Sequence, residues 1–324
     1  MELKTIIKKY SGLVIFAFVF LIGAIWTPVF IQSKNILDIV QYSCETGLLA
    51  AGMTLVIISG GSGIDLSVGS NVALGCMIAA STQASMRFPT FLSVLAAIMV
   101  CGLIGALNGV LITKGKLQPF VATLITMIGA RALALLTNGG MPISTGIPES
   151  YRIIASGKIG PIYYTAVIWI VMIVMVDIIL KNTKFGTDLI ATGGNAEAAY
   201  YSGIEVNKVR FIAYTICGML AGLAGAILTS RLMIGEPRSG YGYELLAIAS
   251  VVMGGTSMEG GRGSALGTMF GVLTLGAIKN LLNVANVNMF MQQVVQGIVV
   301  LLAILVPIFT GYLNERLSNT KINA

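Results

Sequence analysis

Charged side chains inside apolar segments are the residues of this sequence that could do chemistry. Glu45, Arg131 and Lys279 each lie within a long apolar run. Because an ionised group inside a bilayer is unfavourable, such residues either pair with one another or line a polar pathway. We predict that Glu45 pairs with Arg131 or with Lys279, and both roles, pairing and pathway lining, stay open.

Amide side chains form a second group of candidates for lining a pathway. Asn108, Gln292 and Gln296 also lie in apolar segments, and the two glutamines are four positions apart, on one helix face. An amide both donates and accepts hydrogen bonds, which suits the hydroxyl groups of a polar solute. The same groups also join helices to each other within a membrane, and that interpretation is equally open.

This chain contains few residues of the types that form enzyme active sites. The sequence has no histidine, and its four cysteines lie singly in apolar stretches without a CxxC spacing. It contains no GxxxxGK[ST] phosphate loop, so ATP that drives this protein would be bound by another chain. We therefore expect no enzyme activity, no metal site and no cofactor bound by this chain.

Two glycine-rich segments match each other at an offset of 194 residues. Residues 60–70 read GGSGIDLSVGS, residues 254–264 read GGTSMEGGRGS, and each separates two apolar runs. Glycine lets the backbone turn sharply at membrane depth, and such breaks mark the pathways of some transporters. The alternative is two ordinary turns that match by chance. The candidate gating residues are Gly60, Gly61, Asp65, Ser67, Gly69, Gly254, Gly255, Glu259 and Gly263.

Asp65 is the acid of greater interest in these two segments. It precedes Ser67, near which a helix is predicted to start, and the positive end of a helix stabilises a carboxylate. A structural role as a helix cap and a role in gating or in contact with a partner both stay open.

The elements that must position these residues are transmembrane helices. Of the 324 residues, 56% are hydrophobic and 10% are charged, whereas a soluble domain has about 25% charged residues. No polar stretch is long enough to fold alone, so we expect an all-α polytopic membrane protein with one domain, residues 1–324. About ten spans are predicted, or nine if the short eighth is re-entrant: 12–31, 37–59, 68–86, 90–112, 118–137, 162–180, 209–231, 244–257, 264–283 and 290–310.

The distribution of lysine and arginine predicts the orientation of these spans. With the N-terminus inside, twelve of these bases fall on the cytoplasmic side and five fall clearly outside, which follows the excess of positive charge in cytoplasmic loops. Both termini are then cytoplasmic, and the net charge of +7 reflects inner loops rather than binding to nucleic acid. Loop 138–161 lies outside, loop 181–208 lies inside, and both glycine-rich segments open to the cytoplasm.

The inner loop carries one short predicted helix, residues 195–202. Asn195 is a favourable N-cap, Glu197 suits the first turn, and the alanines that follow favour a helix. Gly203 is placed to end it. A helix of this length is not stable alone, so another surface must pack against it.

Three motifs together resemble a known family. They are GGNAEAAYYSGI over residues 193–204, GIDLSVGS over residues 63–70, and VMGGTS followed by GGRGS over residues 252–264. In this order they are similar to the membrane permeases of ribose-type sugar ABC importers, and the resemblance extends over residues 35–310. It implies a multi-pass protein of a bacterial inner membrane.

The resemblance also implies a set of partners. These are a cytoplasmic ATP-binding subunit, an extracytoplasmic sugar-binding protein, and a second copy of the permease or a sister permease. ATP hydrolysed on the separate subunit would drive passage of a monosaccharide, and the helix at 195–202 would be the contact with that subunit. The contact residues implied by the resemblance are Gly193, Gly194, Asn195, Glu197, Ala198 and Gly203.

A self-sufficient secondary transporter or channel for a small polar solute is the alternative function. It would need an acid that couples an ion, and Glu45 or Asp65 would serve. Uptake without any ATPase partner distinguishes this alternative from the importer.

Overall fold

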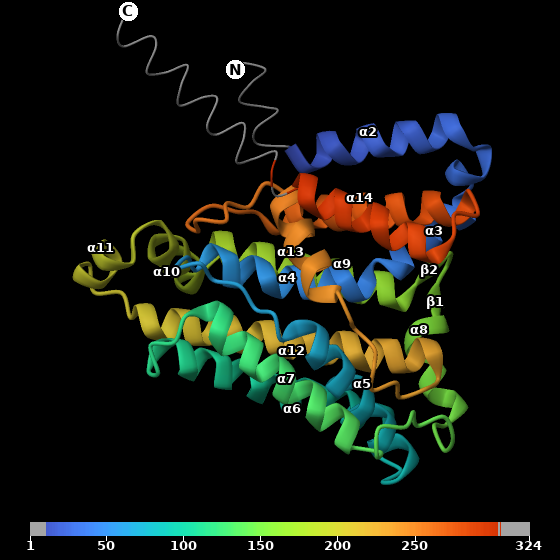
Figure 1. Cartoon of the computed structure of the whole chain (residues 1–324), viewed down its shortest axis with the longest axis horizontal. Helices are drawn as coiled ribbons and strands as arrows, with labels where there is room; N and C mark the ends of the chain where they lie inside the picture. The colour runs from blue at the N-terminus through green and yellow to red at the C-terminus, as the bar shows by residue number, and fades with distance from the viewer. Residues whose placement is uncertain (1–10, 304, 306–324) are drawn as a thin grey trace, which may run out of the picture.

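The computed structural model describes residues 11–303 and residue 305, and it consists almost entirely of helices that run side by side (Figure 1). An apolar helix, Met289–Ala303, follows the last labelled element. The labelled elements are α2 (Ser11–Trp26), η1 (Pro28–Ile31), α3 (Ser33–Tyr42), α4 (Cys44–Ile58), α5 (Val68–Ala84), α6 (Thr90–Thr113), α7 (Pro119–Leu136), η2 (Glu149–Arg152), α8 (Ile153–Ser156), β1 (Lys158–Ile159), β2 (Ile162–Tyr163), α9 (Tyr164–Asn182), α10 (Lys184–Gly194), α11 (Ala196–Tyr201), α12 (Val206–Leu232), α13 (Tyr243–Met253) and α14 (Ala265–Val284).

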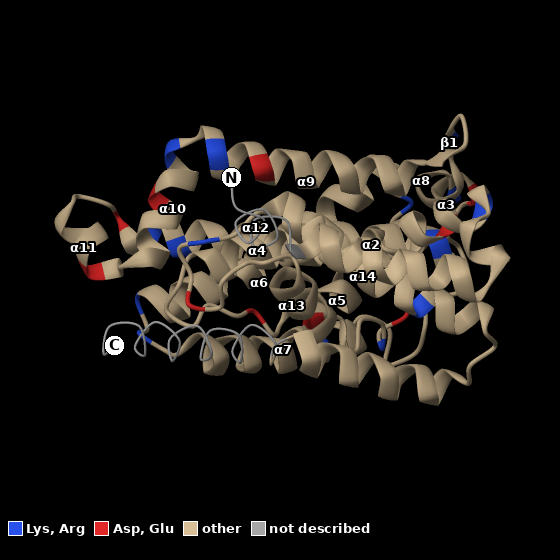
Figure 2. Ribbon diagram, turned by 90° about the horizontal axis from the view of Figure 1, so that it is seen from above, with Lys and Arg blue, Asp and Glu red and all other residues tan. Residues whose placement is uncertain are grey.

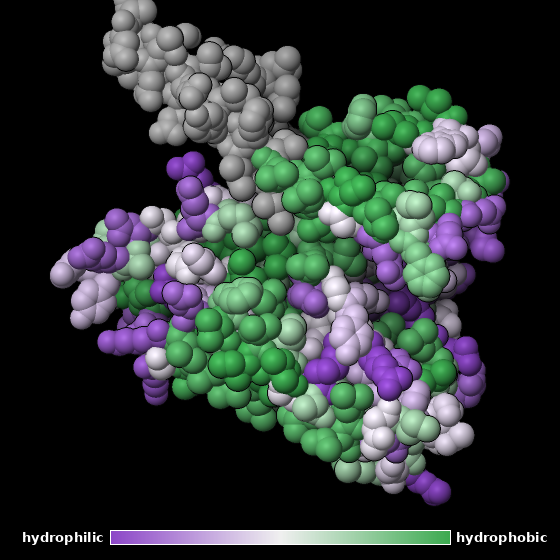
Figure 3. Space-filling view, viewed as in Figure 1, coloured by the Kyte–Doolittle hydropathy of each residue, from purple (hydrophilic) through white to green (hydrophobic). Residues whose placement is uncertain are grey.

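Hydropathy and length confirm an all-α polytopic membrane protein. Within the described ranges five helices are long and apolar enough to cross a bilayer, namely α6, α7, α9, α12 and α14. Shorter apolar helices lie in four of the other predicted spans, and α13, the predicted short eighth one, has 11 residues. The remaining span, 68–86, is occupied by the 17-residue helix α5. Apolar surface covers much of the bundle between its ends, and hydrophilic surface gathers at the end that carries α10 and α11 (Figure 3).

Two predicted spans are not single helices. The segment 12–31 ends as an α-helix at Trp26, and Pro28 starts the short helix η1 because proline cannot continue the hydrogen-bond ladder. The segment 37–59 divides at Ser43 into α3 and α4. Contacts with α9 hold this break: the Cys44 thiol donates to the Thr165 carbonyl at 3.2 Å, and Trp169 lies directly against Gly47.

Helix α12 forms the centre of the bundle. In its most apolar window 72% of the residues are buried, against 28% in α6 and in α7, so α12 is an interior helix and the other two face outward. Gly218 and Gly222 let α6 approach closely, because a Cβ at either position would overlap a carbonyl oxygen of α6. This is the small-residue packing typical of membrane helices.

The two long loops contain structure of their own. Loop 138–161 carries η2, α8 and the hairpin of β1 and β2, which pairs Lys158 with Tyr163 and Ile159 with Ile162. Loop 181–208 carries α10 in addition to the predicted short helix α11. Charged residues gather around α10 and α11 at one end of the bundle and around β1 and α3 at the other (Figure 2). Residues 1–10 and 306–324, which include both termini, lie outside the described residues.

Candidate functional site

Helix α11 forms as the sequence predicts. The Asn195 side chain accepts a hydrogen bond from the Ala198 backbone N–H at 2.9 Å and so caps the helix. After Tyr201 the chain turns at Gly203, whose φ of +86° lies in the left-handed region that glycine adopts without strain. The helix therefore begins and ends at the predicted residues, at one end of the bundle (Figure 1).

The outward face of α11 is exposed. Glu197 and Ala198 are exposed, and so are Tyr200 and Tyr201, at 68% and 79%. The two tyrosine rings pack edge to face with their centroids 5.8 Å apart. Two exposed aromatic rings on a six-residue helix are typical of a surface that another protein covers.

Backbone segments from three parts of the chain meet beside α10. We call the contact of Gly60, Gly193, Gly260 and Gly261 the glycine junction. The Gly261 N–H donates to the Ile58 carbonyl, the last residue of α4, at 2.9 Å. A Cβ on Gly60 would lie 2.7 Å from the Gly193 Cα, and one on Gly260 would lie 2.5 Å from the Gly60 Cα. Both glycine-rich segments therefore touch the end of α10, directly before α11.

The two glycine-rich segments do not make equivalent contacts. Gly254 packs against Gly267 at the start of α14, whereas Gly60, its counterpart at the offset of 194, packs against Gly193. Asp65 is completely buried, whereas Glu259, the acid at the matching position, is exposed. The match in sequence therefore does not carry over to a shared role for the two acids.

Asp65 stabilises the connector between α4 and α5 through hydrogen bonds. Its Oδ1 accepts hydrogen bonds from the Ser67 backbone N–H at 2.9 Å, the Ser67 hydroxyl at 2.6 Å and the Asn108 amide at 3.3 Å. Thr126 of α7 donates to Asn108 at 2.5 Å and extends the network. Burial raises the pKa of the Asp65 carboxyl to about 6, against the opposing effect of the Ser67 and Asn108 hydrogen bonds. Asn108 thus belongs to this buried network.

Replacing Asp65 with alanine is expected to lower the free energy of unfolding by about 2 kcal/mol, because the donors of Ser67 and Asn108 lose their acceptor. Thermal unfolding of the protein in detergent measures this effect. Glu259→Ala is the matched control and should change stability by less than about 0.5 kcal/mol, since Glu259 is exposed. Equal effects of the two substitutions would contradict the structural difference between the segments.

The remaining glycine candidates lie in close contacts. A Cβ on Gly69 would overlap the Glu244 carboxylate of α13, and one on Gly263 would lie 2.7 Å from the Ile58 Cδ1. Gly255 and Gly61 turn with φ of +88° and +64°. These positions need glycine for packing or for the turn.

The predicted partner of Glu45 was wrong. Glu45, which is 2% exposed, lies with its Oε2 3.0 Å from the Nη1 of Arg231, at the end of α12. Arg131 instead donates to the carbonyls of Pro237 and Ser239 at 3.0 and 2.6 Å. Lys279 makes no ion pair within 4 Å of a described acid. Arg231 reaches Glu45 because α12 runs beside α4, a proximity that helical periodicity does not encode.

A cavity of about 300 Å³ adjoins this ion pair. Arg231, Lys279 and Gln296 line it, together with Tyr42 and Tyr243, so Gln296 is the one of the two candidate glutamines that faces this cavity. Gln292, in contrast, donates to Asn283 at 3.2 Å and to the Val287 carbonyl at 2.8 Å, and it does not line the cavity. Within the described residues no group of three or more Cys, Asp or Glu side chains is arranged to hold a metal.

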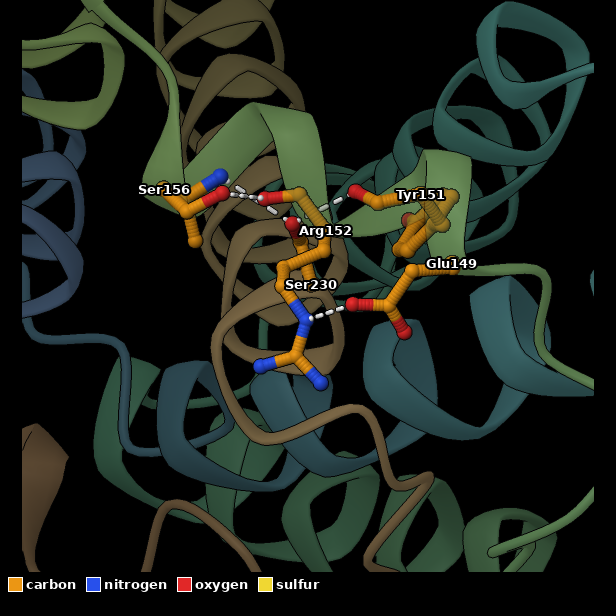
Figure 4. A network of polar contacts seen from close by, with 6 residues as sticks. Glu149, Tyr151, Arg152, Ser156 and Ser230 are labelled. Carbon is orange, nitrogen blue, oxygen red and sulfur yellow. Dashed lines mark hydrogen bonds and ion pairs between the residues drawn. The ribbon is translucent and has the colours of Figure 1, made fainter.

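The loop at the opposite end from α11 is fixed to the bundle by hydrogen bonds (Figure 4). The Ser230 hydroxyl of α12 donates to the Tyr151 carbonyl at 2.7 Å and accepts from the Ala155 N–H at 3.1 Å. The Tyr151 hydroxyl donates to the Ala226 carbonyl at 3.2 Å. Burial raises the pKa of that hydroxyl well above its ordinary value. Glu149 and Arg152 form an exposed ion pair on the outer surface of this loop.

Apolar helices that can cross a bilayer, arranged around a cavity and with the exposed helix α11 at one end, are the architecture of a multi-pass membrane permease. The chain belongs to the family described as "Branched-chain amino acid transport system / permease component", which it matches over residues 35–304. It is a multi-pass protein of the inner membrane, as the sequence predicted.

Curated relatives match nearly the whole chain. The ribose import permease protein RbsC of Escherichia coli K12 is 41% identical over 283 residues, covering 86% of this chain and 87% of the relative. RbsC of Bacillus subtilis is 43% identical over 287 residues, covering 88% of each. The L-arabinose transport system permease protein AraH of E. coli K12 is 33% identical over 299 residues, covering 92% and 89%. These relatives confirm the resemblance that the motifs indicated. No solved structure matches the chain.

Proposed function

We propose that this chain is the permease subunit of a binding-protein-dependent ABC importer and forms the path for a monosaccharide of the ribose or pentose type. The observation that carries the proposal is the identity of 41–43% over 86–88% of the chain to permeases named for ribose import. The family match over residues 35–304 includes the glycine-rich segments, α11 and the cavity. A secondary transporter or channel is not favoured, because the relatives are components of ABC transporters.

ATP is hydrolysed on a separate cytoplasmic subunit in this proposal, and α11 is the surface that docks on it. The exposure of Glu197, Tyr200 and Tyr201 supports this assignment. The glycine junction supports it as well, because Gly193 at the end of α10 touches the ends of α4 and of the 254–264 segment. A displacement of α11 would also move the end of α4 and the 254–264 segment. The contacts between them are backbone to backbone, so no flexible side chain can adjust to the movement.

The outer partner is a sugar-binding protein that docks on loop 138–161. The hydrogen bonds of Ser230 and Tyr151 support this role, because they fix the loop as a preformed surface. Exposed Met141 and Ile159, at 67% and 61%, provide apolar contact area on it. A second permease, identical or a sister chain, completes the path between the two subunits.

Reversing the charge of Glu197 is expected to lower the stimulation of the ATPase by sugar-loaded binding protein about tenfold, a loss equivalent to about 1.4 kcal/mol of coupling. The measurement is ATPase activity in lipid discs after co-expression with the neighbouring ATPase and binding protein, in the presence of sugar-loaded binding protein. Lys34→Glu, an exposed position outside both α11 and loop 138–161, is the control for charge reversal and should keep stimulated ATPase activity. Unchanged stimulation in Glu197→Arg would reject α11 as the docking helix.

A further inference from the structure

The cavity beside α14 is lined by charged side chains that the binding of a neutral sugar does not require. Its lining residues come from α3, the start of α4, α12, α13, α14 and the apolar helix Met289–Ala303. Its volume of about 300 Å³ is at the lower end of the range for small-molecule sites, about 300 to 1,000 Å³. A monosaccharide fits a site of this size.

Positive charge exceeds negative charge at this cavity. Two cations, Arg231 and Lys279, line its wall, and Glu45 is the one described acid within 4 Å of either of them. Glu45 is 2% exposed and is paired with Arg231 alone. One unit of positive charge, on Lys279, therefore remains without a partner among the described residues. Lys279 is exposed and within reach of a ligand.

Arg231 also has a hydrogen-bond donor without an acceptor in the described part of the chain. Its Nη1 is buried and has no hydrogen-bond acceptor among the described residues; it lies 3.0 Å from Glu45 Oε2, and both Glu45 oxygens likewise have no hydrogen-bond donor there. An unsatisfied buried donor in a cavity wall favours a ligand that brings an acceptor oxygen. A carboxylate supplies two such oxygens and also neutralises the spare charge of Lys279.

The other polar groups of the cavity suit hydroxyls. Asn280 is fully engaged, since it exchanges two hydrogen bonds with Asn35, at 2.9 and 2.8 Å. Gln296, Tyr42 and Tyr243 have no side-chain hydrogen bond within the described part of the chain, so they are available to a polyhydroxylated ligand. The Tyr243 ring also offers a flat apolar surface on which a sugar ring can pack, whereas the Arg231 guanidinium lies over the Tyr42 ring, 5.2 Å from its centroid.

We propose that this cavity binds a sugar acid, a polyhydroxylated monocarboxylate, with its carboxylate toward Lys279 and Arg231 and its hydroxyls toward Gln296, Tyr42 and Tyr243. The ligand assignment rests on the proposed transport function and adds the acidic derivatives of these sugars to its substrates. Lys279 is the residue that determines this preference, because the charge of Arg231 is already matched by Glu45.

The test compares D-ribonate with D-ribose, which differ in the carboxylate, for direct binding to the full chain in phosphatidylcholine lipid discs by isothermal titration calorimetry. We expect ribonate to bind at least tenfold more tightly at low salt, and the preference to shrink as ionic strength rises. Lys279→Gln should abolish the preference, and Lys279→Arg should keep it. Lys34→Gln, at the exposed start of α3, is the control and should leave it unchanged.

Equal binding of the two probes, or a ribonate preference that persists in Lys279→Gln, would overturn the inference and leave Lys279 as a membrane-interface residue. Retention of phosphatidylglycerol instead of ribonate, dependent on Lys279, would overturn it in favour of a lipid headgroup. The transport role has a separate readout, stimulation of the ATPase by loaded binding protein. If loaded binding protein stimulates the ATPase normally but ribonate and ribose bind equally, only the acid preference is contradicted. If stimulation is lost but the Lys279-dependent preference for ribonate remains, only the transport role is contradicted.

Discussion

Replacing Gly193 with alanine is expected to reduce ATP-driven sugar uptake to near background. A Cβ at this position would overlap the Ile58 carbonyl oxygen and the Gly261 nitrogen, both of which are backbone atoms. No rotamer change can relieve such a clash, so the end of α4 or the 254–264 segment must shift. The shift would separate α10 and α11 from the segments that they contact, and uptake of labelled sugar by cells that express the full transporter measures the loss.

Gly194→Ala is the matched control for this experiment. A Cβ on Gly194 would have no atom outside its own chain neighbourhood within 4 Å, and alanine favours the helix of which Gly194 is the last residue. Uptake in this variant should be close to that of the unmodified protein. If Gly193→Ala and Gly194→Ala behaved alike, the glycine junction would have no part in transport.

Replacing Glu45 with alanine is expected to lower the free energy of unfolding by about 3 to 5 kcal/mol, because it leaves the Arg231 guanidinium buried without its counter-charge. The side chain of Arg231 is 19% exposed, so water only partly replaces the lost partner. Chemical or thermal unfolding in detergent measures the change. The double variant Glu45→Leu with Arg231→Met removes both charges and should recover most of the lost stability.

The exposed ion pair of Glu149 and Arg152 provides the control for the Glu45 experiment. Its side chains are 77% and 48% exposed, and surface pairs contribute at most about 1 kcal/mol. Glu149→Ala should therefore leave the unfolding transition nearly in place. A small effect of Glu45→Ala, comparable to that of Glu149→Ala, would contradict a buried ion pair between α4 and α12.

Local signals predicted the helices of this protein well. Hydropathy located each span that the structure shows as helix, and the Asn195 cap and Gly203 stop placed α11 to within a residue, because caps and stops act within one turn. The same local chemistry could have revealed α10. The Thr183 hydroxyl accepts from the Gly186 N–H at 3.1 Å, an N-cap whose signal was hidden by the glycines at 186, 193 and 194.

Contacts between distant segments could not be predicted from sequence in the same way. The periodicity of α4 indicates which face of the helix carries Glu45. It does not indicate which of three cations in other apolar segments, Arg131, Arg231 or Lys279, lies opposite that face. Only the packing of α12 against α4 selects Arg231. The glycine junction is a similar case, since Gly60, Gly193 and Gly260 each predict a local turn and their mutual contact depends on the whole fold.

Helix α12 connects events at opposite faces of the membrane through a single rigid element. Its first turns follow α11 directly, and its last turn carries both Ser230, which holds the outer loop, and Arg231, which lines the cavity. With 27 residues it is about 40 Å long, so a tilt of about 5° at its inner end would move Arg231 by about 3.5 Å. In the importer that we propose, this helix would act as a lever, and the distance between Arg231 and Lys279 would change when the ATPase engages α11.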